Sequence, residues 1–367
     1  MKSALFAFLL ALLALAAAPS WAATGADFYV ATVPVEDQSE GARTRAAREG
    51  LATVLIKLTG SRTLEGDPRV QAMLEEVATY LVEYSYVTLP SGPTGDPGGL
   101  GVRIQYDRER IGQTLRAERL PIWPLSRPVL LLWLVVDDPV AGPQPLNGDE
   151  TVAVLNQAFA RRGLTSVHPL YDLEDQLALD PTQIRDFDSE AIASASGRYP
   201  VQGWLVVRVY ETSSGQWRAA WMMDVAGQSL LRQVQAESLE ALLGEMVDQA
   251  ADSLASRYAY VAGDSAGNIE LEISGVESYR DYSRLMALLE GQPMVRQVHI
   301  LAVEEDRLRL RLGVEGGRDQ LRDSLLRGGS LEVVPQNRPA ISNADFLSGA
   351  PLPEVKQVER LRWLSGR

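Results

Sequence analysis

The run VLLLWLVV at residues 129–136 contains eight consecutive apolar residues with no polar residue between them. This pattern is typical of strands that are buried on both faces, whereas a half-exposed strand alternates apolar with polar residues. Eight residues are also too few to cross a bilayer. The run therefore predicts a strand in the centre of an α/β sheet.

The residues after this run predict a central α/β domain over residues 129–261. A helix with Leu155 and Phe159 on its apolar side follows, and VQGWLVVRVYE and WRAAWMMDVAG predict a hairpin. A last helix is predicted from Ser238, with an apolar stripe made of Leu239, Leu242, Leu243, Met246, Val247, Ala250 and Leu254. Together these elements predict a mixed sheet.

Upstream, residues 23–120 predict a small α+β domain. A strand over residues 27–35 precedes a helix that Asp37 or Ser39 can cap and that Gly60 ends. Its apolar residues recur at helical spacing: Ala47, Leu51, Val54, Leu55 and Leu58. Residues 121–128, PIWPLSRP, contain three prolines and predict a stiff, extended connector to the central domain.

Downstream, residues 262–268 (AGDSAGN) predict a linker. Residues 269–334 then follow the order β-α-β-β-α-β, which is that of a ferredoxin-like domain. RLRLRL is the sharpest alternation in the chain and predicts a strand with one buried face. The last segment, residues 335–367, contains several prolines and is expected to be flexible.

The first residues predict export. Lys2 precedes an apolar run of about fifteen residues, and small residues around Ala22 suit a signal peptidase, which indicates a signal peptide over residues 1–22. The alternative is an uncleaved anchor, for which the run is short. No later segment is long and apolar enough to span a bilayer. Because the chain has no cysteine, a bacterial periplasm is the expected location and disulfides are excluded.

The charge balance disfavours nucleic acid as a partner. The formal net charge is −13, and removing a leader whose only charged residue is Lys2 makes it one unit more negative. An acidic protein is repelled by phosphate backbones and by anionic lipid surfaces.

The residues that usually carry catalysis are scarce. The two histidines, His168 and His299, have no histidine neighbour, so neither predicts a metal site, and no GxSxG motif is present. LTGSRT lacks the second glycine and the lysine of a phosphate-binding loop, so it is interpreted as a helix end. No cofactor and no metal are expected.

Two groups of charged residues remain as candidates. Asp137 and Asp138 follow the buried strand, where open α/β sheets place ligands, although consecutive residues point to opposite sides and a solvated strand end explains them as well. Arg307, Arg309 and Arg311 share one face of a strand and predict either a solvent face or a docking site for an acidic protein surface. An acidic cluster over residues 172–188 lacks calcium-loop spacing and is interpreted as solvated helix faces.

Three phrases resemble a known family. VATVPVEDQSEGARTRAAREGLATVLIKLTGSR, AERLPIWPLSRPVLLLWLVVDD and VQGWLVVRVYE are similar to exported proteobacterial proteins with domain of unknown function 2066. The resemblance covers about residues 27–262, and it implies compartment and boundaries but no catalytic residue. In element order, the chain also resembles the amino-terminal domain of TolB and outer-membrane activators of wall synthases, which implies binding to other envelope proteins.

The expected function is that of a non-enzymatic periplasmic accessory or scaffold protein that binds another cell-envelope protein. The alternative is a small-molecule-binding protein or an enzyme with its site near Asp137 and Asp138. A docking protein should expose an apolar or arginine-lined patch, whereas an enzyme should have a concave pocket with several converging polar groups.

Overall fold

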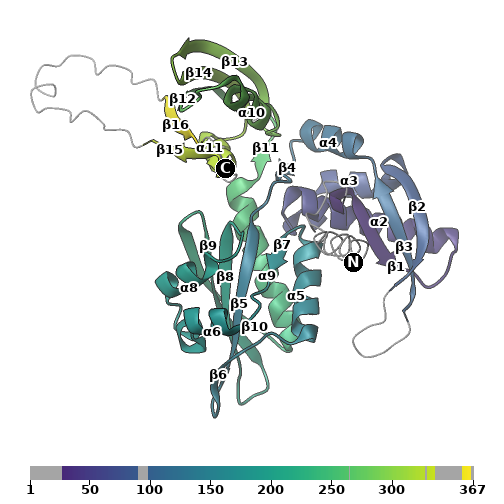
Figure 1. The fold of residues 1–367 in the computed structure, drawn as a ribbon. Coiled ribbons are helices and arrows are strands. Elements are labelled where there is room, and N and C mark those ends of the chain that lie inside the picture. The colour runs from purple at the N-terminus through teal and green to yellow at the C-terminus, as the bar shows by residue number, and fades with distance from the viewer. Residues whose placement is uncertain (1–26, 90–97, 264, 327–328, 335–357, 365–367) are drawn as a thin grey trace, which may run out of the picture.

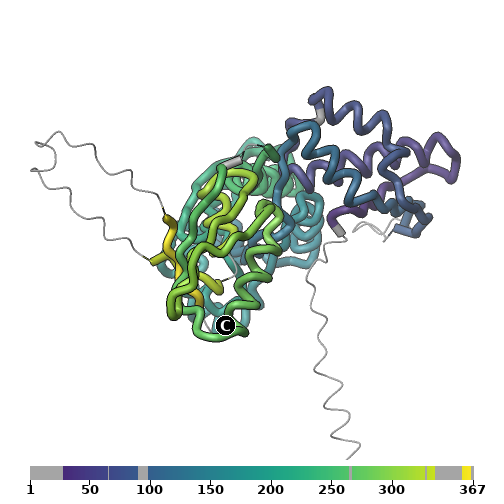
Figure 2. The backbone as a smooth tube through the Cα atoms, turned by 90° about the horizontal axis from the view of Figure 1, so that it is seen from above, coloured from purple at the N-terminus to yellow at the C-terminus, as the bar shows by residue number. Residues whose placement is uncertain are grey.

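The computed structural model describes residues 27–89, 98–263, 265–326, 329–334 and 358–364. The chain is a mixed α+β protein with several sheets and separate hydrophobic cores. The N-terminal unit lies beside the central unit, and the third unit lies over one end of the central unit (Figures 1 and 2). The predicted signal peptide and residues 335–357 of the predicted tail lie outside the described residues.

The N-terminal unit is a three-stranded antiparallel sheet packed against helices. The strands are β1 (Val30–Pro34), β2 (Leu81–Thr88) and β3 (Leu100–Tyr106), in the order β1-β3-β2. The helical elements are η1 (Asp27–Tyr29), α2 (Glu40–Thr59), η2 (Thr63–Gly66), α3 (Pro68–Glu75), η3 (Val77–Thr79) and α4 (Arg108–Ala117). Because the order is β1-β3-β2, β1 is an edge strand of this sheet.

Helix α2 has the apolar face that the spacing predicts. Leu51, Val54, Leu55 and Leu58 are all buried in the core of the N-terminal unit. Of the two predicted caps, Ser39 is the one used, because its hydroxyl oxygen accepts a hydrogen bond from the amide of Ala42 at 3.1 Å.

Gly60 ends α2 in the left-handed conformation, with φ at +74°. It also lets two other parts of the chain approach closely. A Cβ atom there would overlap the Cβ of Ala255 and lie 2.7 Å from Cε3 of Trp123. The position therefore requires glycine both for its backbone conformation and for packing between units.

Tyr106 joins the sheet to α2. Its hydroxyl donates a 2.7 Å hydrogen bond to the carbonyl of Ala47, and burial raises its pKa well above the ordinary 10.0. We expect Tyr106→Phe to lower the free energy of unfolding by about 1–2 kcal/mol at pH 8, because it removes a buried hydrogen bond between the sheet and α2. Urea denaturation of both proteins measures this difference.

The same pair of proteins should respond differently to alkaline pH. Below pH 10 the phenol is neutral in both the folded and the unfolded state, so the hydrogen bond from Tyr106 contributes fully to the free energy of unfolding. Above pH 10 it ionises more readily in the unfolded state, so the wild type loses stability as the pH rises towards its folded pKa. The difference between wild type and Tyr106→Phe should therefore shrink above pH 10, and a constant difference up to pH 11 would contradict the assignment.

The connector over residues 121–128 lies where the three units meet. Strand β4 (Pro121–Ile122) pairs with β11 (Tyr260–Val261), which immediately precedes the third unit. The amide of Trp123 donates to the carbonyl of Leu58 at 2.7 Å. Arg127 lies over the Trp123 ring, 3.7 Å from its centroid, and donates to the carbonyls at the end of the first helix of the central unit.

The central unit is built on the strand that the apolar run predicts. Its strands are β5 (Val129–Asp138), β6 (Gly142–Pro145), β7 (Thr165–Val167), β8 (Gly203–Glu211), β9 (Trp217–Val225) and β10 (Gln228–Ala236). The sheet order is β10-β9-β8-β5-β6, with β7 also paired to β5. Because β5 is parallel to β7 and β8 while the other pairs are antiparallel, the sheet is mixed.

Helices cover both faces of this sheet (Figure 1). They are α5 (Asp149–Arg161), α6 (Leu173–Ala178), α7 (Pro181–Arg185), α8 (Ser189–Ser196) and α9 (Leu239–Tyr258). Leu132 of β5 packs in the core formed with α5 and α9, and the adjacent Trp133 packs in the core formed with α7 and α8. The unbroken apolar run thus has the two buried faces that it predicts.

The third unit contains the predicted β-α-β-β-α-β order. Its elements are β12 (Ser265–Ser274), α10 (Tyr279–Glu290), β13 (Val295–Glu304), β14 (Arg307–Glu315), α11 (Arg318–Leu326), β15 (Leu331–Val333) and β16 (Glu359–Trp363). Leu308, Leu310 and Leu312 are buried against the helices. The predicted linker over residues 262–268 is too long, because β12 already begins at Ser265. Strand β12 contains a β-bulge between Ser265 and Gly267, where Gly267 has a positive φ.

The prediction of a flexible tail is wrong for residues 359–363. Strand β16 lies between β12 and β15, parallel to the first and antiparallel to the second. Leu361 and Trp363 point into the core, and the indole of Trp363 donates to a carboxylate oxygen of Asp281 at 3.3 Å. A strand that joins a partner more than 80 residues earlier leaves no local pattern except this short alternation.

Within the described residues, no helix combines the length and the apolar character that a membrane span requires.

Candidate functional site

The two aspartates at the end of β5 are part of a hairpin. Asp137 and Asp138 are the last two residues of β5, and they pair with Pro143 and Gly142 of β6. One carboxylate oxygen of Asp138 accepts hydrogen bonds from the amides of Val140 and Ala141, each at 2.7 Å, and these bonds lower the pKa of Asp138. The structure thus gives Asp138 a turn-stabilising role.

The predicted arginine row projects from the sheet face of the third unit that the helices leave uncovered. Arg307 and Arg309 are exposed, and Arg311 is half-buried. Acidic residues flank the row, because Arg311 donates to Glu270 at 3.0 Å and Glu272 lies opposite Arg309 on β12. The face is therefore a mixture of both charges, in which Arg309 is exposed and makes no ion pair with another described residue.

His168 lies apart from both groups, whereas His299 of β13 lies opposite Arg311 in the β13–β14 ladder. The ring of His168 is near the side chain of Asn156 at 3.1 Å, and burial lowers its pKa. The ring of His299 is near Gln297 at 3.3 Å. In the described part of the chain, no group of three or more His, Cys, Asp or Glu side chains could hold a metal ion.

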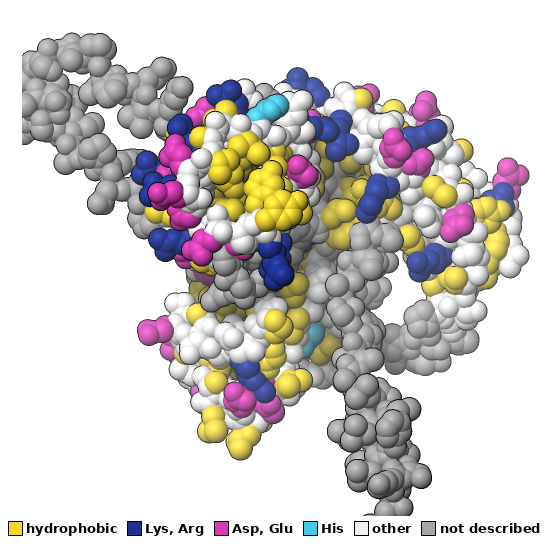
Figure 3. Space-filling view, turned by 45° about the horizontal axis from the view of Figure 1, so that its top comes forward, with side chains coloured by type: hydrophobic (Ala, Val, Ile, Leu, Met, Phe, Trp, Pro, Cys, Tyr) yellow, Lys and Arg dark blue, Asp and Glu magenta, His cyan; other side chains and the backbone are white. Residues whose placement is uncertain are grey.

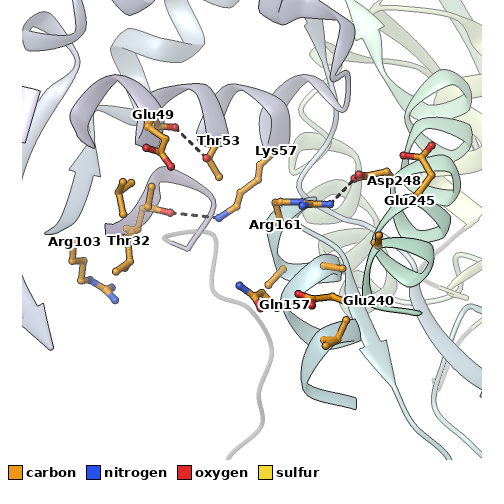
Figure 4. Close-up of a pocket in the computed structure, with 18 of the residues that line it drawn as sticks. Thr32, Glu49, Thr53, Lys57, Arg103, Gln157, Arg161, Glu240, Glu245 and Asp248 are labelled. Atoms are coloured by element: carbon orange, nitrogen blue, oxygen red, sulfur yellow. Dashed lines mark hydrogen bonds and ion pairs between the residues drawn. The ribbon is translucent and has the colours of Figure 1, made fainter. Parts of the chain in front are cut away.

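A cleft that sequence patterns did not predict lies between the N-terminal and central units. Its volume is 920 Å³, which falls within the range of roughly 300–1,000 Å³ that ligand sites occupy. Strand β1, helix α2 and Arg103 of β3 form one wall, and helices α5 and α9 form the other (Figure 4). The polar residues that line it are Thr32, Glu49, Thr53, Lys57, Arg103, Gln157, Arg161, Ser238, Glu240, Glu245 and Asp248.

The charges in this cleft are unevenly distributed. Arg103 lies on the β1 side, where Lys57 also approaches the carbonyl of Val30 at 3.5 Å. Glu240 lies on the opposite wall, in the first turn of α9 (Figure 4). The described residues that line the cleft include no histidine and no cysteine, and its polar groups include carboxylates, guanidinium groups, an amine and hydroxyls.

A network of ion pairs closes one end of the cleft. Asp248 and Asp252 of α9 accept hydrogen bonds from Arg162, which is only 1% exposed, and Arg162 also donates to the carbonyl of Gly60 at 2.9 Å. Arg62, which follows α2, donates to the same two carboxylates at 3.2 and 3.0 Å. Arginines from two units thus share carboxylates of one helix.

The pKa of Arg62 reflects this network. Burial alone would lower it, but hydrogen bonds to Glu245 and Asp252 raise it above its ordinary value. The one local signal of the network is the acidic spacing on α9, because Glu245, Asp248 and Asp252 recur at i, i+3 and i+7 beside the apolar stripe. That signal does not identify the partners.

Comparisons with known proteins give one family-model match, over part of the chain, and no activity. Residues 22–124 match a family model described as a domain of unknown function (DUF8605), so this part of the chain is similar to an uncharacterised domain. The matching model is a different one from domain of unknown function 2066, which the sequence phrases resembled. No curated protein matches.

Among solved structures, one titled "Crystal structure of uncharacterized protein" is 12% identical. The match covers 35% of this chain and 86% of that chain, with a TM-score of 0.16, and it supports no conclusion about function.

Proposed function

We propose that this protein is an exported, non-enzymatic accessory protein of the bacterial periplasm that binds another cell-envelope protein. The observation that carries the proposal is the uncovered sheet face of the third unit, from which Arg307, Arg309 and Arg311 project. A row of cations on a protein of net charge −13 suits the recognition of an acidic protein surface. We further propose that this unit is a ferredoxin-like domain with β16 inserted, and that the central unit has a TolB-like element order.

Exposed apolar side chains also occur elsewhere on the third unit. Ile300, Val303 and Val333 pair with the buried residues Leu310, Leu308 and Leu361, so they lie on the sheet face that carries the helices and not on that of the arginine row. Hydrophobic side chains gather over the third unit in Figure 3. Those with large exposed fractions in this unit are Tyr279, Ile300, Leu301, Val303 and Val333. The alternative site at Asp137 and Asp138 has no comparable support, because Asp138 already stabilises a turn.

The location is tested separately from the partner. We expect the mature chain in the fraction released by osmotic shock, with an amino terminus at Ala23 or close to it. A chain that stays on membranes with Met1 intact would contradict export with cleavage.

The docking face is tested by crosslinking in cells. A photoreactive amino acid at position 309 should crosslink to one defined envelope protein, and the same amino acid at position 48, on the exposed side of α2, should not. With the purified partner, replacing Arg307, Arg309 and Arg311 by glutamine should weaken binding about tenfold or more, with less dependence on salt.

The matched control replaces three other exposed arginines, Arg45, Arg48 and Arg232, by glutamine. It makes the same change in net charge and should leave binding unchanged. Equal weakening by both triple variants would assign the effect to net charge and contradict the proposed face.

A further inference from the structure

The open edge of β1 is an unused row of backbone hydrogen-bonding groups. Strand β1 pairs with β3 alone, and the amide of Val35, just beyond β1, donates to the carbonyl of Leu100 at 2.9 Å. In an antiparallel ladder, successive residues point their backbone groups to opposite sides. Because Val35 bonds to β3, Val33 and Ala31 do so as well. Thr32 lies between them, and its amide and carbonyl therefore point away from β3.

That edge faces the cleft rather than bulk solvent. Residues 30–33 of β1 line it, and α5 and α9 form its far wall (Figure 4). Pro34 has no amide, and Lys57 approaches the carbonyl of Val30, so pairing is restricted to a few residues around Thr32. Edge strands of native proteins commonly limit their pairing with other chains in this way, which reduces aggregation.

The side chains beside this edge specify a charge pattern. Arg103 lies directly opposite Thr32 across the β1–β3 ladder, is exposed, and has no ion-pair partner among the described residues. Because threonine is short, the guanidinium can reach over it to a side chain on an added strand. Glu240 is exposed on the opposite wall and likewise has no ion-pair partner in the described part of the chain.

We propose that β1 binds an extended peptide segment of a partner protein as an additional strand in this cleft. The segment hydrogen-bonds to the Thr32 backbone, places an acidic side chain near Arg103 and places a basic side chain near Glu240. Strand addition supplies affinity through the backbone and specificity through side chains on alternate positions. This site lies in a different unit from the docking face above and does not depend on it.

The experiment selects peptides on the whole mature chain. A phage-displayed library of random seven-residue peptides should yield sequences that contain one acidic and one basic residue. A synthetic peptide of the selected sequence should bind the wild type and Thr32→Val with similar affinity, because valine keeps the amide. Thr32→Pro removes that amide and should weaken binding about tenfold or more, although the β1–β3 ladder needs no donor there.

Two further measurements keep the result clear if Thr32→Pro disturbs the fold, which circular dichroism would report. The selected peptide should slow hydrogen exchange of the Thr32 amide in the wild type, and an N-methylated form of it should not bind. Arg103→Gln should weaken binding of the acidic peptide and leave an otherwise identical peptide with glutamine in place of its acidic residue unaffected.

Several results would overturn the proposal. They are the absence of any enriched peptide, equal binding to a folded Thr32→Pro protein, and binding by the N-methylated peptide. A concentration-dependent dimer that disappears in Thr32→Pro would instead assign the edge to a second copy of this chain. Crosslinking at position 309 tests the docking face of the third unit alone. Its result does not affect the peptide measurements, so the two proposals can fail independently.

Discussion

Arg162→Ala is expected to lower the free energy of unfolding by about 3–5 kcal/mol, because it breaks a buried ion pair and removes a buried guanidinium that joins two units. The guanidinium is 1% exposed and joins Asp248 and Asp252 of α9 to the carbonyl of Gly60 in the N-terminal unit. Its removal takes away the buried donor of Asp248 and of the Gly60 carbonyl, while Arg62 and Arg161 still contact Asp248. The attachment of the N-terminal unit to the central unit should weaken as well.

Urea denaturation of the full chain measures the loss, and the neighbouring Arg161 is the matched control. Its guanidinium also donates to Asp248, at 2.9 Å, but its side chain is 52% exposed. Arg161→Ala should therefore cost no more than about 1 kcal/mol, as solvated ion pairs do. Equal losses in the two variants would mean that burial of Arg162 does not determine its contribution.

A double variant separates the cost of an uncompensated charge from the value of the pair. Replacing Arg162 by methionine and Asp248 by leucine removes both charges from the site. Because buried pairs often contribute little net stability, this protein should be more stable than Arg162→Ala. A double variant as unstable as Arg162→Ala would indicate that the hydrogen bond from Arg162 to Gly60, or the loss of the pairs that Arg62 and Arg161 make with Asp248, dominates.

Leu55→Asp is expected to unfold the N-terminal unit, with a loss of about 5 kcal/mol or more. Leu55 is buried in the core between α2 and the sheet, so the substitution removes apolar burial and places an unpaired carboxylate there. Thermal melting followed by circular dichroism should show early loss of part of the helical signal.

Arg48, on the exposed side of the same helix, is the control position. Arg48→Ala should change stability by less than about 0.5 kcal/mol, because surface substitutions away from special features rarely exceed that. Similar melting temperatures for the two variants would show that the buried face of α2 is wrongly assigned.

Local patterns in the sequence were sufficient for the elements that bury their own residues. The face of α2 that carries Leu55, the doubly buried strand β5 and the alternation of β14 all follow from periods of side-chain burial within a few residues. Strand β10 was not predicted, because it is mostly exposed and lacks a clear alternation. The order of elements in the third unit could be read from the chain, whereas the position of β16 could not.

The candidate sites divide in the same way. The arginine row of β14 could be predicted, since three residues at alternate positions on one strand must share a face. The cleft could not, because its walls come from elements that are distant in sequence, such as β1 and α9. Thr32 has no distinguishing sequence feature, and only the pairing of β1 with β3 shows that its backbone groups are open.

The sequence by itself determined the positions of the helices and buried strands, because burial on one side imposes a period that neighbouring residues display. Tertiary structure alone decided which units meet at Gly60 and Arg162, where β16 joins its sheet, and which strand edge stays open. These features depend on backbone groups and on pairings between distant residues. Neither leaves a periodic trace in the chain, because a backbone amide is the same at every position and a distant partner imposes no local spacing.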